Sequence, residues 1–108
     1  MKDTRTVSLG LTPLFTAEKA CAVSVLKLEL PIDPVGMMNT FLEKIEIHLH
    51  RNQYTNEARL REEPVILSRG QSASIRLNLQ LAPGETILGS TGIGTSVKVE
   101  TTYEETPE

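Results

Sequence analysis

Two histidines alternate with aliphatic residues in the stretch from Lys44 to His50. His48 and His50 fall on one face of an expected strand, about 6–7 Å apart along it, and Glu46 shares that face. Two imidazoles at this spacing are able to bind one metal ion, but a third protein ligand has to come from elsewhere. The alternative is that both side chains are solvated on a polar sheet face. We expect neither a metal nor another cofactor, and no enzymatic activity, because no nucleophile is tied to either histidine by a motif.

Basic residues lie along the same expected strand and just beyond it. Lys44, His48, His50 and Arg51 form a weakly basic stripe, which Arg76 extends if the two central strands pair. Such charges are common on the polar face of a sheet, and the chain has few aromatic residues that could stack on bases. The net charge of −3 gives no electrostatic footprint for nucleic acid. The sequence therefore disfavours nucleic acid and leaves these five residues as candidates for protein interaction.

The segment from Gly84 to Thr91 has the glycine spacing that opens a phosphate-binding loop. The lysine of that motif is missing, and the segment precedes an expected strand rather than a helix. Both differences matter, because the helix N-terminus and the lysine supply most of the attraction for phosphate. We therefore expect a surface loop over 86–94.

Cys21 is the single cysteine of the chain, which excludes an internal disulfide and a site of four thiolates within one chain. It falls on the apolar face of an expected strand, so we interpret it as a small buried side chain rather than a reactive thiol. The absence of disulfides is typical of the reducing cytoplasm, which is the location we expect. The polar N-terminus leads into no long apolar run, so we expect no signal peptide and no membrane span.

Alternating polarity defines the elements that position these residues. From 44 to 50 and from 74 to 81 an apolar side chain occupies every second position, which predicts antiparallel strands with one buried face. A helix would spread the same side chains around its circumference. The core residues expected from these two strands are Ile45, Ile47, Leu49, Ile75, Leu77, Leu79 and Leu81.

Further strands are expected over 6–11, 21–30, 65–67 and 95–103. Thr12-Pro13 ends the first of these, for which an edge position is an option. Val25-Leu26 breaks the alternation of the second, which predicts a β-bulge or a strand buried on both faces. The segment 14–20 is compatible with a short helical turn that is too short to be stable alone.

The spacing of strands and turns predicts the fold class. Strands at intervals of about 8–12 residues with turn signals between them indicate an all-β fold, an immunoglobulin-like antiparallel β-sandwich of about seven strands. The chain is long enough for a single core. We assign 1–103 to one β-sandwich domain and 104–108 to an acidic, frayed tail.

The order of elements from Cys21 to Leu81 resembles the water-stress and hypersensitive-response (WHy) domain of late-embryogenesis-abundant (LEA) proteins. In that family an Asn-Pro step follows an early strand, and Asp33-Pro34 stands in its place; Ser68-Arg69-Gly70 is similar to a later element. The later strands of an arrestin-like domain are nearly as similar to 42–50, 79–81 and 97–99. Both families are β-sandwiches without catalytic residues, so the resemblances imply the fold more than a function.

These observations lead us to expect a non-catalytic interaction module with a stress-associated, scaffold or assembly role. A protein partner or a second copy would bind through an edge strand, a polar sheet face or the end loops. Two alternatives stay open. One is a viral or surface-assembly structural subunit, and the other is a metal-binding protein or enzyme that uses His48 and His50.

Overall fold

The computed structural model describes residues 1–32, 42–51 and 58–107. These residues contain no helix, and their strands pair only in the antiparallel direction. The strands are β1 (Lys2–Thr16), β2 (Cys21–Glu29), β3 (Leu42–His50), β4 (Ala58–Arg59), β5 (Val65–Ser68), β6 (Ser72–Leu81) and β7 (Thr86–Glu105). The predicted all-β antiparallel sandwich is confirmed, while an immunoglobulin-like connectivity stays a prediction. In the described ranges there is no helix that could cross a membrane.

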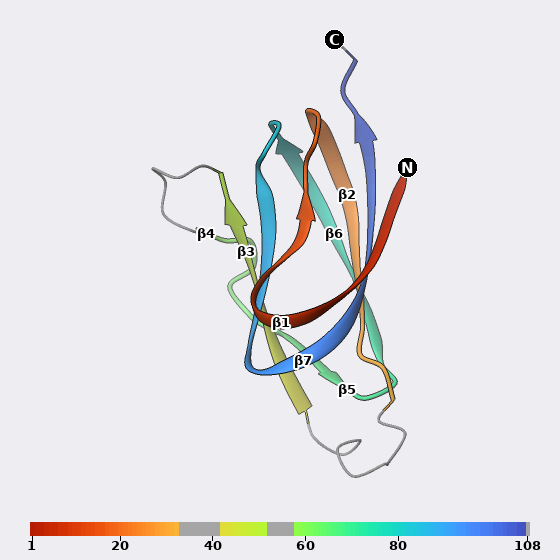
Figure 1. Ribbon diagram of the computed structural model, residues 1–108, viewed down its shortest axis with the longest axis vertical. Coiled ribbons are helices and arrows are strands. Elements are labelled where there is room, and N and C mark those ends of the chain that lie inside the picture. Colours follow the sequence, from red (N-terminus) through yellow and green to blue (C-terminus); the bar gives the residue numbers. More distant parts are fainter. Residues whose placement is uncertain (33–41, 52–57, 108) are drawn as a thin grey trace.

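Two layers form because β1 and β7 are long and bend from one layer into the other (Figure 1). In the first layer β2 lies between β6 and the C-terminal half of β7, which pairs on its other side with the N-terminal half of β1. In the second layer β3 lies between the N-terminal half of β7 and the short strands β4 and β5. The C-terminal half of β1 completes this layer beyond β7. Among the described strands, β1 is therefore an edge strand of both layers.

The bend uses unequal numbers of residues on the two strands. Leu9 pairs with Thr95 and Leu11 pairs with Ser90, so one residue of β1 lies opposite four residues of β7, 91–94. The outer arc of a bend has to be longer than the inner arc. β7 therefore follows the outside and β1 the inside, and Figure 1 shows both strands curving back near the bottom of the view.

The core lies between the layers. It is filled by the inward-facing side chains of both, so the expectation from alternating polarity is confirmed for the two central strands. Of the seven expected core residues, two are partly buried against the core, Leu77 and Leu79, and five are buried, namely Ile45, Ile47, Leu49, Ile75 and Leu81.

The β-bulge predicted on β2 is also present. The register of β2 against both of its neighbours shifts between Val23 and Val25. Against β7, Ser24 of β2 has no counterpart, and against β6 it lies opposite two residues, 77 and 78. The shift reverses which positions of β2 face inward. Val23 on one side of the bulge and Leu26 on the other are therefore both buried in the core.

Pro13 does not end the first strand as predicted, because β1 continues to Thr16. On an edge strand one side of the backbone has no partner strand, and a proline there removes no ladder bond. The segment 14–20 contains no helical turn: three of its residues belong to β1, and 17–20 connect β1 to β2.

The loop predicted over 86–94 is wrong, because these residues form the first part of β7. Gly89 lies in this strand for a packing reason rather than to make a turn. A Cβ atom added at Gly89 would lie 2.8 Å from Cδ2 of the buried Leu14. At the other end of β7, Glu104 and Glu105 pair with β2 and so belong to the sheet. The Asp33-Pro34 step falls outside the described residues.

Candidate interaction site

The basic residues proposed from the sequence do not form one continuous stripe. Lys44, His48 and His50 lie on the outward-facing positions of β3, in the second layer. Arg76 lies on β6, in the first layer, and β3 and β6 are separated by β7 and β2 in the strand order. The two central strands do not pair, so the condition for adding Arg76 to the stripe is not met.

The two histidines are less exposed than side chains on a solvated sheet face. The His48 side chain is 15% exposed, and its Nε2 lies 3.3 Å from Glu46 Oε2. Nδ1 of His50 is buried, and no described residue bonds to it. Across the described ranges, no three His, Cys, Asp or Glu side chains are placed to hold a metal ion together. The third ligand that a site at His48 and His50 would need is therefore not found in this part of the chain.

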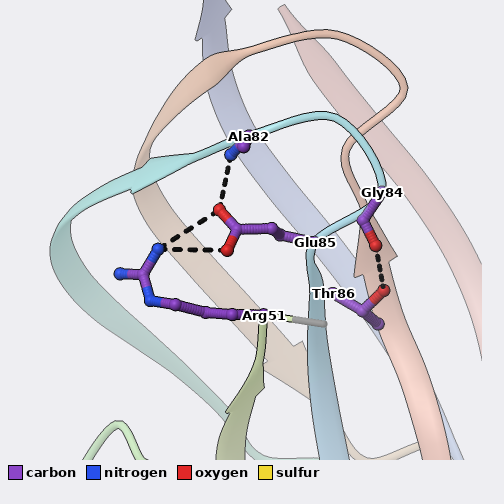
Figure 2. Close-up of polar contacts among 5 residues, drawn as sticks. All are labelled: Arg51, Ala82, Gly84, Glu85 and Thr86. Atoms are coloured by element: carbon purple, nitrogen blue, oxygen red, sulfur yellow. Dashed lines mark hydrogen bonds and ion pairs between the residues drawn. The ribbon is translucent and has the colours of Figure 1, made fainter. Parts of the chain in front are cut away.

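Arg51 takes part in a polar network at the turn between β6 and β7 (Figure 2). Its Nη1 donates to both carboxylate oxygens of Glu85, at 3.2 and 3.1 Å. Glu85 Oε1 also accepts a hydrogen bond of 2.6 Å from Ala82 N. Glu85 is 7% exposed, whereas the Arg51 side chain is 50% exposed. The buried carboxylate thus holds the turn in place through the hydrogen bond from Ala82 N, and the Arg51 side chain covers the carboxylate at the protein surface.

The same turn is tied to the connection between β1 and β2. Gly84 N donates to Ala17 O at 2.7 Å, and Ala17 N donates to Glu85 O at 3.0 Å. Gly84 has a φ of +87°, a conformation that glycine adopts without steric cost. The turn between β6 and β7, the connection between β1 and β2, and the end of β3 are therefore held together by hydrogen bonds as one structural corner. Arg51 has a structural role in this corner.

The N-terminal half of β1 leaves backbone groups without a partner strand. Met1 N donates to Tyr103 O at 2.8 Å, and Tyr103 N donates to Met1 O at 2.9 Å. Bonded pairs alternate in an antiparallel ladder, so even-numbered residues of this half direct their backbone groups away from β7. Of the described strands, β7 alone pairs with β1. Lys2, Thr4 and Thr6 therefore present N–H and C=O groups at an unpaired edge.

This unpaired edge ends at the bend of β1. The Thr12 hydroxyl donates to Ser8 O at 2.8 Å and accepts a hydrogen bond of 3.2 Å from Gly10 N. Ser8 and Gly10 are even-numbered, which agrees with the alternation deduced from the Met1 pair. The Thr12 side chain bonds where a neighbouring strand otherwise would. The segment 2–6 is left, and we call it the open edge.

A cleft of about 270 Å³ lies beside the open edge. Asp3 and Arg5 line it from positions of β1 that share the inward phase of Val7. Arg5 Nε donates to Asp3 Oδ2 at 2.7 Å, and both side chains are partly exposed. Charged groups do not fill a dry interior, and here they line a cleft between the two layers instead. Phe15 and Tyr103, from opposite layers, also line the cleft, with ring centroids 5.0 Å apart.

The lining of this cleft suits binding better than covalent chemistry. It contains no histidine, and its one cysteine, Cys21, is buried as predicted. Burial, and to a smaller extent the charge of Glu105, raises the pKa of the Cys21 thiol above its ordinary value. The protonated thiol that results is a weak nucleophile. The remaining polar lining is mostly charged and of mixed sign.

Except for Thr6, the open edge lies outside the strand predicted at 6–11. Its first residues, 2–5, carry no apolar side chain, and apolar alternation was the signal that defined the other strands. A second signal is present. Asp3 and Arg5 occupy alternate positions on the same side of the strand as Val7, and inward-pointing charges are a feature of edge strands.

Comparisons of the chain with protein-family models, with curated proteins and with solved structures found no match. The resemblances to the WHy domain and to the arrestin-like domain therefore stay predictions. The open edge and the cleft beside it are the features from which a function has to be argued.

Proposed function

We propose that this chain is a non-catalytic β-sandwich interaction module that binds its partner by strand addition at the open edge. The observation that carries the proposal is the regular ladder behind this edge. From Lys2 to Leu9 the pairing of β1 with β7 has no register shift, so the unpaired groups are evenly spaced. An incoming extended segment bonds to such groups at every second residue.

The cleft supports the proposal because it gives an added strand something to recognise. Side chains of a strand alternate between faces, so every second side chain of the added strand would lie over the cleft. There it would meet Asp3, Arg5 and the cleft lining. Backbone bonds would supply the affinity, and these side chains the selectivity. A scaffold or assembly role follows from binding of this kind.

The other outer strands are less suited to strand addition. β4 has two residues and β5 has four. β6 has ten residues and pairs with β2 alone among the described strands. Leu60 and Arg61, which follow β4, line a hollow together with the middle of β6. The chain itself thus approaches the middle of β6.

A pair of substitutions at Thr6 tests the proposal. Thr6→Pro removes an outward N–H, and Thr6→Val changes the side chain but keeps that N–H. Peptides selected on the wild-type protein from a random library displayed on phage are the probe. We expect Thr6→Val to bind them like the wild type. Thr6→Pro should bind them at least about fivefold more weakly, the equivalent of one backbone hydrogen bond of about 1 kcal/mol.

Hydrogen exchange shows where on the protein a selected peptide binds. The amides of Thr4 and Thr6 should exchange fast in the free protein and slowly with a selected peptide bound. Circular dichroism of the Thr6→Pro protein checks that it is folded. The proposal is wrong if the library yields no binders, or if the selected peptides bind folded Thr6→Pro as well as they bind the wild type.

A further inference from the structure

We infer that the partner at the open edge is a second copy of this chain, paired antiparallel to the first about a twofold axis at Thr4. The inference rests on the proposed function, because it uses the same edge. It follows from the order of residues along that edge, which is complementary to itself in one register.

The backbone groups match in this register. Lys2 faces Thr6 of the second copy, and Thr4 faces its own equivalent. These are the residues whose N–H and C=O groups point away from β7. Two facing residues of this kind exchange two hydrogen bonds in an antiparallel ladder. The free groups of the open edge therefore all find partners.

The inward-facing side chains match as well. Asp3 faces Arg5 of the second copy and Arg5 faces Asp3, which gives two contacts between unlike charges. Met1 faces Val7 of the second copy on the same face. Met1 is 57% exposed in the single chain, and this pairing would cover it. Unlike charges and apolar pairs directly opposite each other are the cross-strand arrangements that stabilise a sheet.

Other registers that bring the free backbone groups together lack this complementarity. A pair centred on Asp3 places Asp3 opposite its own equivalent, and a pair centred on Arg5 does the same for Arg5. Like charges directly opposite each other destabilise a sheet. A pair centred on Thr6 places Arg5 opposite Val7 and gives neither charge an oppositely charged residue on the second copy. Asp3 and Arg5 therefore disfavour pairing in these other registers and favour the register centred on Thr4.

The assembly would be closed. A twofold axis uses the same edge of both copies, so no open edge remains at β1 to add a third chain. The first layers of the two copies would form one continuous sheet. A contact of a few residues on each strand is smaller than a standard stable interface, so we expect dimerisation to depend on concentration.

Charge exchange tests the register. At the inward-facing positions 3 and 5 of each open edge, Asp3→Arg places two cations and Arg5→Asp places two anions, so each variant alone should dimerise on the order of tenfold more weakly than the wild type. An equimolar mixture restores Asp–Arg contacts at both places and should dimerise like the wild type. Sedimentation velocity over a concentration series measures all four samples. Dimerisation of the mixture also shows that both variants are folded.

Disulfide trapping adds a second measurement of the same register. The Cα atoms of a hydrogen-bonded pair lie about 5.5 Å apart, within the span of a disulfide. Thr4→Cys should therefore form a covalent dimer under mild oxidation. Thr6→Cys is the matched control, because its equivalent in the second copy lies four positions further along the strand pair. The buried Cys21 should leave the wild-type protein uncrosslinked.

The outcomes separate this inference from the proposed function. A wild-type protein that stays monomeric refutes the dimer, and so does a dimer that is indifferent to both charge variants or a mixture that fails to recover. If peptides that require the Thr6 N–H are still selected, the strand-accepting function stands without the dimer. If neither dimer nor such peptides are found, both proposals fall.

Discussion

Replacement of Glu85 separates the two contacts of its buried carboxylate. Glu85→Gln keeps an oxygen that can accept the hydrogen bond from Ala82 N and removes the charge opposite Arg51. Because the Arg51 side chain is 50% exposed, the lost ion pair should cost about 0–1 kcal/mol, as for a surface pair. Glu85→Ala removes the acceptor for Ala82 N as well. An orphaned backbone group costs about 1–3 kcal/mol, so we expect a total of about 1–4 kcal/mol.

Urea denaturation followed by circular dichroism measures these differences, with midpoints compared at equal slope. Arg51→Ala is the matched control and should cost no more than Glu85→Gln. The expected order places Glu85→Ala clearly above the other two. If Glu85→Gln or Arg51→Ala costs as much as Glu85→Ala, the ion pair holds the corner and the hydrogen bond to Ala82 does not.

Two further predictions concern the core. Gly89→Ala should lower the free energy of unfolding by about 1–3 kcal/mol, because the new Cβ overlaps the buried Leu14; thermal denaturation measures it, and combination with Leu14→Ala should cost less than the two single losses together. The Cys21 thiol should react with iodoacetamide far more slowly in the native protein than in urea. Glu105→Gln should increase the rate of the native reaction only modestly, because burial is a larger cause of the raised pKa than the charge of Glu105. Since the folded pKa lies above that of the unfolded chain, the contribution of this thiol to stability is present below the ordinary thiol pKa and is lost as pH rises through the folded pKa. A urea midpoint that falls with alkaline pH equally in Cys21→Ala would contradict that assignment.

The sequence shows which face of each central strand is buried, but it does not show which strands pair with each other. Alternating polarity on β3 and β6 shows which side of each strand is buried, because burial acts on one side chain at a time. It carries no information about which strands pair, and these two strands lie in different layers. The bulge on β2 was predictable for the same reason as the faces, because Val25-Leu26 interrupts the alternation locally.

Features that depend on distant residues were not predictable. Gly89 reads as a loop residue because glycine usually marks turns, and its place in a strand is explained only by Leu14 packed against it. Glu85 reads as a polar turn residue, and its burial depends on Arg51, which is 34 positions away in the chain. The open edge of the candidate site was missed because its residues carry charge where the other strands carry apolar side chains.

The ladder between β1 and β7 has a consequence for biosynthesis. It joins Lys2 to Thr102, so two segments that lie far apart in the sequence have to pair. Long-range pairing of this kind is slow, because a large loop has to be closed before any contact rewards it. During synthesis, residues 2–9 of β1 have no described partner strand until residues 95–102 have been made. The edge that we propose as the binding surface therefore forms only after β7 has been made, and a partner that recognises it distinguishes chains in which β1 and β7 have paired from chains in which they have not.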